Sequence, residues 1–361
     1  MNASKPRCGE NLMPKIRLMI VDDSLFFRTF LTRTIGNDQS IEIVGSFGDP
    51  VVALKGVETL NPDVIALDME MPRMRGDDFL RAALPTHPKV KTIVISALSN
   101  NIFDAMQAGA IDFIPKPGSS PGYGEAEFIK DIIAKIKIAS TANVVPKSVP
   151  TKPQKPQTTM PVSSAIKQHI GIPSKDLIAI GASTGGTEAI IQVVKNFPAN
   201  APGVVVVQHM PPVFTRMYAE RVNGLCAMKA VEAKNGARIE KGTIYIAPGG
   251  DQQMYVRKDV DGYYILLKKD AKVSGHCPSV DVLFSSVAEV AGKNSVGVLL
   301  TGMGADGANG LLGMKRAGAH TIAQDEATCV VYGMPMEAVK IGAATQQMAL
   351  SEIGSAVIRR F

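Results

Sequence analysis

The 361-residue sequence has little cysteine, no long apolar run and almost no surplus charge outside one segment. Its four cysteines, Cys8, Cys226, Cys277 and Cys329, lie far apart with no CxxC pair, which excludes a disulfide framework or a cysteine-rich zinc site. No apolar run approaches the roughly 18 residues that a membrane helix needs, and the N-terminus lacks the apolar core of a secretion signal. We therefore expect reduced thiols, no membrane insertion and a cytoplasmic location.

The net charge of +6 is concentrated in one stretch. Residues 141–175 contain five lysines and no acidic residue, so the rest of the chain carries 6 − 5 = +1. This near-neutral remainder lacks the basic surface that duplex binding requires, and we expect no nucleic-acid partner. The same segment contains six prolines and the tandem KPQKPQ, which indicates a flexible linker. A basic tail that contacts an acidic surface is the alternative.

The chain is long enough for two domains, and its first part alternates strand and helix signals. Helical stretches of about 15 residues separate the apolar runs. This alternation predicts a parallel sheet covered on both faces. The predicted strands are residues 16–21, 41–47, 63–69, 91–97 and 111–116.

Polar residues follow these strands where ligands of such folds bind, at the carboxyl ends. Asp22 and Asp23 follow the first strand, Asp68 the third, Ser96 the fourth and Lys116 the fifth. Singly, each acid could be a helix cap and the lysine part of a turn. Together, three converging carboxylates predict a hard divalent cation such as Mg²⁺, beside which one carboxylate can accept a phosphoryl group.

The stretches MIVDDS, VIALDMEMPRMRG, TIVISAL and AIDFIPKP resemble, in order and spacing, the receiver domain of two-component response regulators. The resemblance covers residues 15–138 and implies a flavodoxin-like five-stranded sheet. It implies that Asp68 is phosphorylated and that Asp22, Asp23, Asp68 and the carbonyl of Glu70 bind Mg²⁺. Ser96 and Lys116 then contact the phosphoryl group, and Phe113 reports phosphorylation. We expect residues 1–14 to be a disordered extension and residues 139–174 a flexible linker.

The second half repeats the α/β alternation and shows no helix-turn-helix pattern with a basic recognition helix. It predicts a second doubly wound, mainly parallel α/β domain. The predicted strands are residues 176–181, 203–208, 242–248, 263–269, 295–301 and 320–324.

Ser183 stands in the turn after the first of these strands. The sequence Gly181-Ala182-Ser183-Thr184-Gly185 fits the GxSxG pattern, in which small residues allow a sharp turn that exposes a nucleophilic serine. A helix cap is the alternative role for the serine. A phosphate-binding Walker loop is excluded, because residues 181–188 contain no lysine.

A serine nucleophile needs a base and an acid, and two further strand ends supply candidates. Among five histidines, only His209 directly follows a valine-rich strand, which places it at the same edge as Ser183, although a structural role is the alternative. His276 adjoins Cys277, and neighbouring side chains diverge, so we expect no dyad there. Asp306, after residues 295–301, completes a predicted Ser-His-Asp triad.

The same turn offers a competing interpretation. Residues 302–307 fit GxGxxG, and Asp325 follows at the distance seen in dinucleotide-binding folds. The motif lies near the end of its domain, where a two-half Rossmann layout would not begin. A receiver-coupled dinucleotide-binding protein remains the alternative function.

The stretches IGASTGG, VVVQHM with PPVFT, and LLTGMGADGANGL resemble the catalytic domain of the chemotaxis methylesterases, the CheB family, over residues 175–361. The resemblance implies a protein-glutamate methylesterase and protein-glutamine glutaminase with Ser183, His209 and Asp306 as the triad. The N–H of Thr184 is the natural oxyanion donor, and the family adds that of Met303. No cofactor is implied at this site.

The resemblance also implies partners and regulation. The substrates are methyl-accepting chemotaxis receptors, and the phosphodonor is the chemotaxis histidine kinase CheA. The unphosphorylated receiver covers the esterase cleft, and phosphorylation of Asp68 relieves the block. One residue departs from the family pattern: Cys277 stands where arginine is usual after the histidine of the HxPSVD segment, so the charge and planar fork of arginine are missing.

Overall fold

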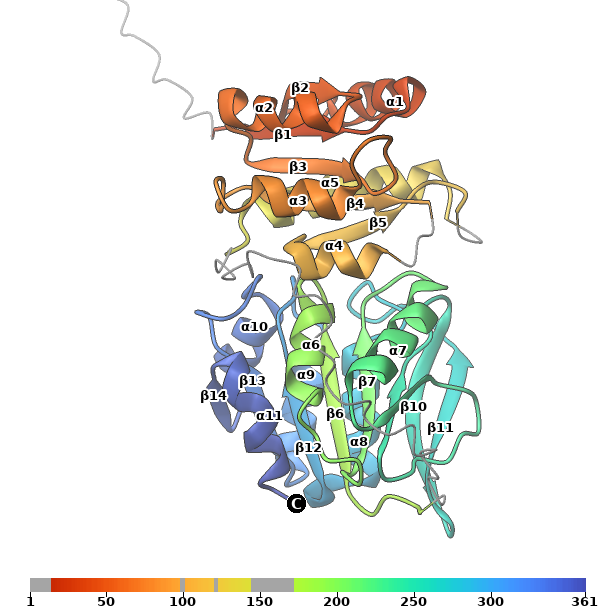
Figure 1. Ribbon diagram of the computed structural model, residues 1–361. Helices are drawn as coiled ribbons and strands as arrows, with labels where there is room; N and C mark the ends of the chain where they lie inside the picture. The colour runs from red at the N-terminus through yellow and green to blue at the C-terminus, as the bar shows by residue number, and fades with distance from the viewer. Residues whose placement is uncertain (1–13, 98–100, 120–122, 144–171) are drawn as a thin grey trace, which may run out of the picture.

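The computed structural model describes residues 14–97, 101–119, 123–143 and 172–361, which form two α/β units stacked on each other (Figure 1). Two predicted segments lie largely outside the described residues: residues 1–13 of the predicted N-terminal extension, and residues 144–171 of the predicted linker. The helix that closes the first unit continues to Ser140, so the predicted linker begins within it.

The first unit is a five-stranded parallel sheet in the order β2-β1-β3-β4-β5, which confirms the predicted receiver fold. Its strands are β1 Ile16–Val21, β2 Ile41–Phe47, β3 Val64–Asp68, β4 Lys91–Ser96 and β5 Asp112–Pro115. Its helices are α1 Leu25–Ile35, α2 Pro50–Leu60, α3 Gly76–Ala83, α4 Ile102–Ala108 and α5 Glu125–Ser140.

Alternation along each strand sends side chains to two cores. Leu18 and Ile20 of β1 pack in the core that includes residues of α1 and α5. Met19 and Val21 pack in the core that includes residues of α2, α3 and α4. Because helices cover both faces of the sheet, most residues of these strands are apolar, which makes the strands readable in the sequence.

The second unit is a seven-stranded sheet in the order β14-β13-β12-β6-β7-β9-β8, with every pair parallel. Its strands are β6 Leu177–Ala182, β7 Gly203–Gln208, β8 Lys229–Glu232, β9 Thr243–Ile246, β12 Ser295–Leu299, β13 His320–Gln324 and β14 Gln346–Met348. A separate antiparallel pair comprises β10 Gln252–Asp259 and β11 Gly262–Lys269.

The helices of the second unit cover both faces of its sheet. They are α6 Gly186–Val194, α7 Phe214–Leu225, α8 Val280–Val290, α9 Ala308–Arg316, α10 Met334–Lys340 and α11 Leu350–Ile358, with a 3₁₀ turn at Gly292–Asn294. Residues of α6, α7 and α11 share a core with Ile178 and Ile180 of β6. Residues of α8, α9 and α10 share the other core with Leu177 and Ala179, together with the β10–β11 hairpin.

The predicted strand at residues 263–269 is confirmed as β11. This stretch is a strand, but it pairs antiparallel with β10 and lies outside the parallel sheet. Its burial alternates and then gives way to exposed lysines, as expected of a hairpin with one covered face. The mostly polar β10 was not predicted, nor were the short edge strands β8 and β14.

The strand order brings three predicted strand ends together. β12, β6 and β7 are neighbours in the sheet, and Ser183, His209 and Asp306 follow β6, β7 and β12 respectively. Because all three strands are parallel, these residues lie at one edge. Within the part of the chain described, no helix has both the length and the apolar character needed to cross a membrane.

Candidate active site

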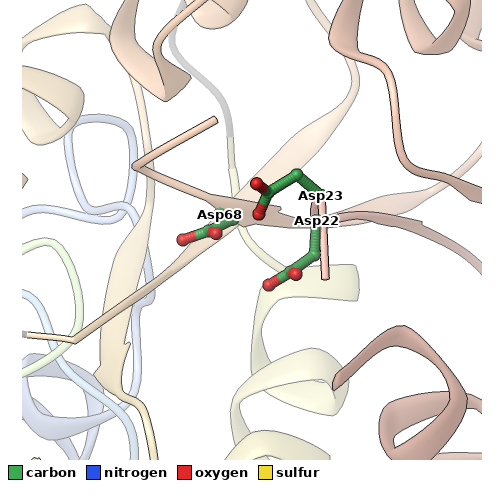
Figure 2. A group of neighbouring side chains, drawn as sticks. All are labelled: Asp22, Asp23 and Asp68. Carbon is green, nitrogen blue, oxygen red and sulfur yellow. The ribbon is translucent and has the colours of Figure 1, made fainter. Parts of the chain in front are cut away.

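The first polar cluster lies at the carboxyl ends of β1 and β3 in the receiver. Asp22, Asp23 and Asp68 offer carboxylate oxygens that all lie within 4.8 Å of one another (Figure 2). The ammonium of Lys116 donates to Asp22 Oδ2 and Asp68 Oδ2, each at 2.9 Å. The structure therefore brings the three predicted carboxylates and the predicted lysine together.

Two features of this cluster suit it to binding a ligand: the Asp68 carboxyl is buried, and the nearby Ser96 hydroxyl has unused hydrogen-bonding capacity. Burial raises the pKa of the Asp68 carboxyl, although the hydrogen bond and charge of Lys116 lower it. The Ser96 hydroxyl is buried without a hydrogen-bond partner among the described residues. Three hard oxygen donors fit Mg²⁺, and a buried hydroxyl with free capacity fits an added phosphoryl oxygen.

Glu70 and Phe113 extend the cluster in different directions. The N–H of Glu70 donates to Asp68 Oδ1 at 3.4 Å, and its exposed side chain leaves the loop after β3 accessible. Phe113 is only 4% exposed and lies on β5, three residues before Lys116. Its ring packs on Phe214 of α7 with a centroid separation of 4.9 Å, so it contacts the second unit.

Ser183 occupies a turn fixed by backbone hydrogen bonds. Its N–H donates to the carbonyl of Thr301 at 3.0 Å, and its carbonyl accepts from Gly186 N–H at 2.7 Å. In this turn Gly185 has a positive φ of 77°, whereas Ser183 does not have positive φ. The predicted small-residue turn is present, but the strain of a nucleophile elbow does not fall on the serine itself.

His209 and Asp306 form a direct hydrogen bond. His209 Nε2 lies 2.8 Å from Asp306 Oδ2, with the histidine side chain 9% exposed and the aspartate 1%. His209 N–H also donates to the carbonyl of Ala182, so His209 is held against the strand that precedes Ser183. His209 Nδ1 is buried and has no hydrogen-bond partner among the described residues. It therefore makes no hydrogen bond with the Ser183 hydroxyl in this structure.

Asp306 is held in its charged form by donors from the start of α8. Ser279 Oγ donates to Oδ1 at 2.6 Å, and the N–H groups of Val280 and Asp281 donate at 2.8 and 3.0 Å. Burial pushes the pKa of Asp306 upward, but the hydrogen bonds from His209, Ser279 and Asp281 outweigh it, and the pKa lies below its ordinary value. The N-terminus of α8 adds its dipole in the same direction.

Two supporting residues were not predicted from the sequence. Gln208 Nε2 donates to the carbonyls of Ser183 and His209 at 2.8 and 3.2 Å and so ties the two residues together. A Cβ at position 186 would lie 2.1 Å from Gln208 Oε1, so Gly186 leaves the space that this side chain occupies. Ser279 follows Pro278 in the HCPSVD segment, where serine before an apolar run is an N-cap signal that could have been read.

The predicted oxyanion donors, Thr184 and Met303, lie in the turns after β6 and β12, and Cys277 lies in the segment before α8. Thr184 is buried, and its carbonyl accepts from Thr301 Oγ1 at 3.0 Å. Met303 is 49% exposed in the turn after β12. Cys277 is partly buried, and burial raises the pKa of its thiol, which disfavours a reactive thiolate.

The receiver contacts this site directly. Thr184 Oγ1 donates to Asp112 Oδ2 of β5 at 2.9 Å, and Lys135 of α5 pairs with the same oxygen at 2.7 Å. Beside this contact, Phe103 of α4 packs on Tyr218 of α7 with centroids 5.6 Å apart. Figure 1 shows α4 lying between the receiver sheet and the second unit.

The geometry of the GxGxxG turn leaves its residues committed elsewhere. Asp306 binds His209 and the start of α8, and Asp325 Oδ1 accepts from Thr328 N–H at 3.0 Å. A Cβ at Gly302 would lie 2.7 Å from Ser183 Cβ, so this glycine allows close approach of the serine turn. The arrangement favours the triad over the dinucleotide alternative.

Comparisons with known proteins agree with both halves of this description. The model of the response regulator receiver domain matches residues 18–122, and that of CheB methylesterase matches residues 178–357. The Syntrophomonas wolfei protein-glutamate methylesterase/protein-glutamine glutaminase 2 is 47% identical over 345 residues, covering 96% of this chain and 97% of that protein.

A Caulobacter vibrioides protein-glutamate methylesterase/protein-glutamine glutaminase 1 is 42% identical and covers 96% of this chain and 98% of its own length. The crystal structure of the Thermotoga maritima CheB methylesterase catalytic domain aligns with a TM-score of 0.50 at 35% identity, covering 52% of this chain and 98% of that domain. These matches confirm the resemblance drawn from the sequence. The chain belongs to the CheB methylesterase family, with a response regulator receiver domain preceding the catalytic domain.

Proposed function

We propose that this enzyme removes methyl esters from glutamyl side chains of methyl-accepting chemotaxis receptors and converts specific receptor glutamines to glutamate. The observation that carries the proposal is the meeting of Ser183, His209 and Asp306 at the ends of three adjacent strands, with a 2.8 Å bond between the histidine and the aspartate. The names of the relatives support the reaction class.

In this proposal each of the three residues has one step. Ser183 Oγ attacks the ester carbonyl carbon, and its proton passes to His209 Nδ1, the nitrogen that Asp306 leaves free. The ionised Asp306 stabilises the resulting imidazolium. The serine rotates toward Nδ1 when substrate binds, since catalytic hydrogen bonds often tighten only in the substrate complex.

The remaining steps release methanol and then regenerate the enzyme. The N–H groups of Thr184 and Met303 stabilise the tetrahedral oxyanion, and His209 returns the proton to the leaving oxygen, so methanol departs. Water then attacks the acyl-serine carbon and gives one proton to His209; the Ser183 Oγ–carbon bond breaks, His209 passes that proton to Ser183 Oγ, and glutamate leaves. A glutamine amide follows the same course with ammonia as the leaving group.

The receiver supplies regulation in this proposal. Asp22, Asp23, Asp68 and the carbonyl of Glu70 would hold Mg²⁺, which when bound neutralises charge on an incoming phosphoryl group. The chemotaxis histidine kinase CheA would phosphorylate Asp68, and Ser96 and Lys116 would bind the phosphoryl oxygens. In this proposal the docked receiver keeps substrate from the serine, because Asp112 of β5 accepts a hydrogen bond from Thr184 Oγ1 beside it, and Lys135 of α5 pairs with that same carboxylate.

Methanol release from methylated receptors tests the proposal. We expect Ser183→Ala and His209→Ala each to abolish release, and Asp68→Asn to abolish stimulation by acetyl phosphate. A dinucleotide-binding protein would instead bind NAD, lose that binding in Gly302→Ala and be indifferent to Ser183→Ala. An unchanged rate in Ser183→Ala rules out the esterase mechanism.

A further inference from the structure

A second histidine lies directly on the proposed base. The rings of His209 and His276 are stacked with centroids 3.6 Å apart and planes inclined by 10°. Aromatic pairs ordinarily prefer offset or edge-to-face arrangements with centroids roughly 4.5–7 Å apart. A nearly eclipsed pair at this distance is therefore imposed by its surroundings.

The surroundings that impose the stack form a tight turn. Val273 and His276 exchange both backbone hydrogen bonds, at 3.0 and 2.9 Å, across Ser274 and Gly275. Both central residues have positive φ, 53° and 84°, the pattern of a type I′ turn. Positive φ at a serine is uncommon, and such conformations gather at functional sites.

The fully buried side chain of Gln253 also holds this turn in place. Gln253 Nε2 donates to the carbonyls of Ala271 and His276 at 3.0 and 3.2 Å, and its Oε1 accepts from Ser279 N–H at 2.7 Å. Ser279 in turn donates to Asp306. One buried amide thus holds both the segment that carries the stacked ring and the residue that holds the triad aspartate.

The stacked ring is uncharged at neutral pH. Burial lowers the pKa of His276 to about 4, and the neighbouring His209 and the lysines Lys272 and Lys135 act in the same direction, opposed by Asp306. A neutral ring presents an electron-rich face, which attracts a cation placed over it. His209 becomes such a cation only after it takes the serine proton.

We propose that His276 is a positioning residue for the proposed esterase reaction: its ring fixes the plane of His209 between Ser183 and Asp306 and stabilises the imidazolium formed during catalysis. The inference rests on the proposed function, since it concerns the same base. It assigns no proton transfer to His276, which acts through His209 alone.

Steady-state kinetics on a soluble receptor fragment carrying glutamyl methyl esters, with acetyl phosphate present, test the proposal. His276→Ala is expected to lower kcat by about 10- to 100-fold with KM changed less than about threefold, because the loss falls on the transition state. His276→Phe keeps a planar face and is expected to restore kcat to within about fivefold of the unmodified enzyme.

The matched control is His320→Ala, which removes a half-buried histidine of the same domain that contacts Gln346 away from the site. It should leave kcat unchanged. Equal losses of kcat in the Ala and Phe variants, or no loss in either, would overturn the role of the stack. Persistence of methanol release in Ser183→Ala would overturn the proposed function itself, so the two failures are distinguishable. Circular dichroism and thermal unfolding of each variant report folding independently.

Discussion

At the residue scale, the site depends on the ionised Asp306. Four donors converge on its two oxygens, from His209, Ser279, Val280 and Asp281, and they keep the carboxylate charged despite burial. A carboxylate so placed can only accept hydrogen bonds, which fixes the tautomer of His209 with its proton on Nε2. In the proposed mechanism, Nδ1 is then left unprotonated and receives the serine proton.

Replacing this carboxylate with an amide tests its role. Asp306→Asn is expected to lower kcat for methanol release by about 10³- to 10⁴-fold, because the amide cannot accept all four donors or hold the correct tautomer. The conservative comparison is Ser279→Ala, which removes one donor and the helix cap and should cost about 1 kcal/mol of stability. Near-equal kcat values for Asp306→Asn and the unmodified enzyme contradict the assignment.

The low pKa of His276, about 4, predicts a pH dependence of stability. Between about pH 4 and 6.5 an unfolded histidine binds a proton that the folded one does not, so the free energy of unfolding falls as pH falls through this window. His276→Phe lacks this loss, so the change in its free energy of unfolding across the window should be smaller by up to roughly 3 kcal/mol. Denaturant unfolding of the full chain at several pH values measures it, and parallel curves for the two proteins would exclude it.

The sequence identified the residues at strand ends but not those that approach through space. Ser183, His209 and Asp306 each follow a buried, valine- or leucine-rich strand, and parallel strands share an edge. The sequence predicts no dyad between His276 and its chain neighbour Cys277, and it carries no signal for a partner elsewhere in the chain. Its partner His209 lies 67 positions earlier (276 − 209), and the contact depends on a turn of unusual φ.

At the element scale, the serine turn depends on the close approach of β6 and the turn after β12. Gly302 lies in that second turn, where a Cβ would come within 2.3 Å of Met334 Sδ and 2.7 Å of Ser183 Cβ. The GxGxxG pattern in the sequence therefore reflects packing against the turn that holds Ser183. The motif alone could not distinguish this from approach to a pyrophosphate.

Gly302→Ala is expected to destabilise the catalytic domain by about 1–3 kcal/mol and to lower methanol release, because the added methyl displaces Ser183. The matched control is Gly313→Ala in the middle of α9, where a Cβ meets nothing within 4 Å. This control should raise stability by up to about 1 kcal/mol through helix propensity. Thermal unfolding and kcat of both variants test the contrast, and similar effects at the two positions refute it.

The elements best predicted from sequence are strands that carry a run of mostly apolar residues. The boundaries of β1, β2, β7 and β13 coincide with the predicted runs, although only β7 is buried along its whole length and β2, at the sheet edge, has only Ile41 buried. The edge strands β8 and β14 and the hairpin strand β10 carry exposed polar residues, so no apolar run signals them.

At the scale of the whole molecule, β5 connects the two sites. Lys116, directly after the strand, binds Asp68, while Asp112 at its start binds Thr184 of the catalytic domain. Phe113 lies between them and packs on Phe214. In the proposed regulation, phosphorylation of Asp68 would change the partners of Lys116, and a small shift of this strand would reach the contact beside Ser183. This gives the proposed regulation a continuous physical route.

Loss of the interdomain hydrogen bond should favour the open state. Asp112→Ala removes the acceptor of Thr184 and the partner of Lys135, and about 1–1.4 kcal/mol of docking energy corresponds to a roughly 5- to 10-fold higher basal methanol release. Activity with acetyl phosphate should stay the same. The control is Asp38→Ala, which breaks a comparable ion pair between Lys137 of α5 and a position remote from this contact. A basal rate that rises equally in both variants argues against a specific role of the Thr184–Asp112 hydrogen bond in holding the receiver on the catalytic domain.

Covalent labelling of the nucleophile tests the central claim most directly. The full chain is treated with a fluorophosphonate in the presence of acetyl phosphate, and the modified peptide is located and timed by mass spectrometry. The account predicts one adduct, on Ser183, formed at least about 100-fold more slowly in His209→Ala. An adduct on another residue, or labelling of Ser183 at the same rate without His209, would contradict it.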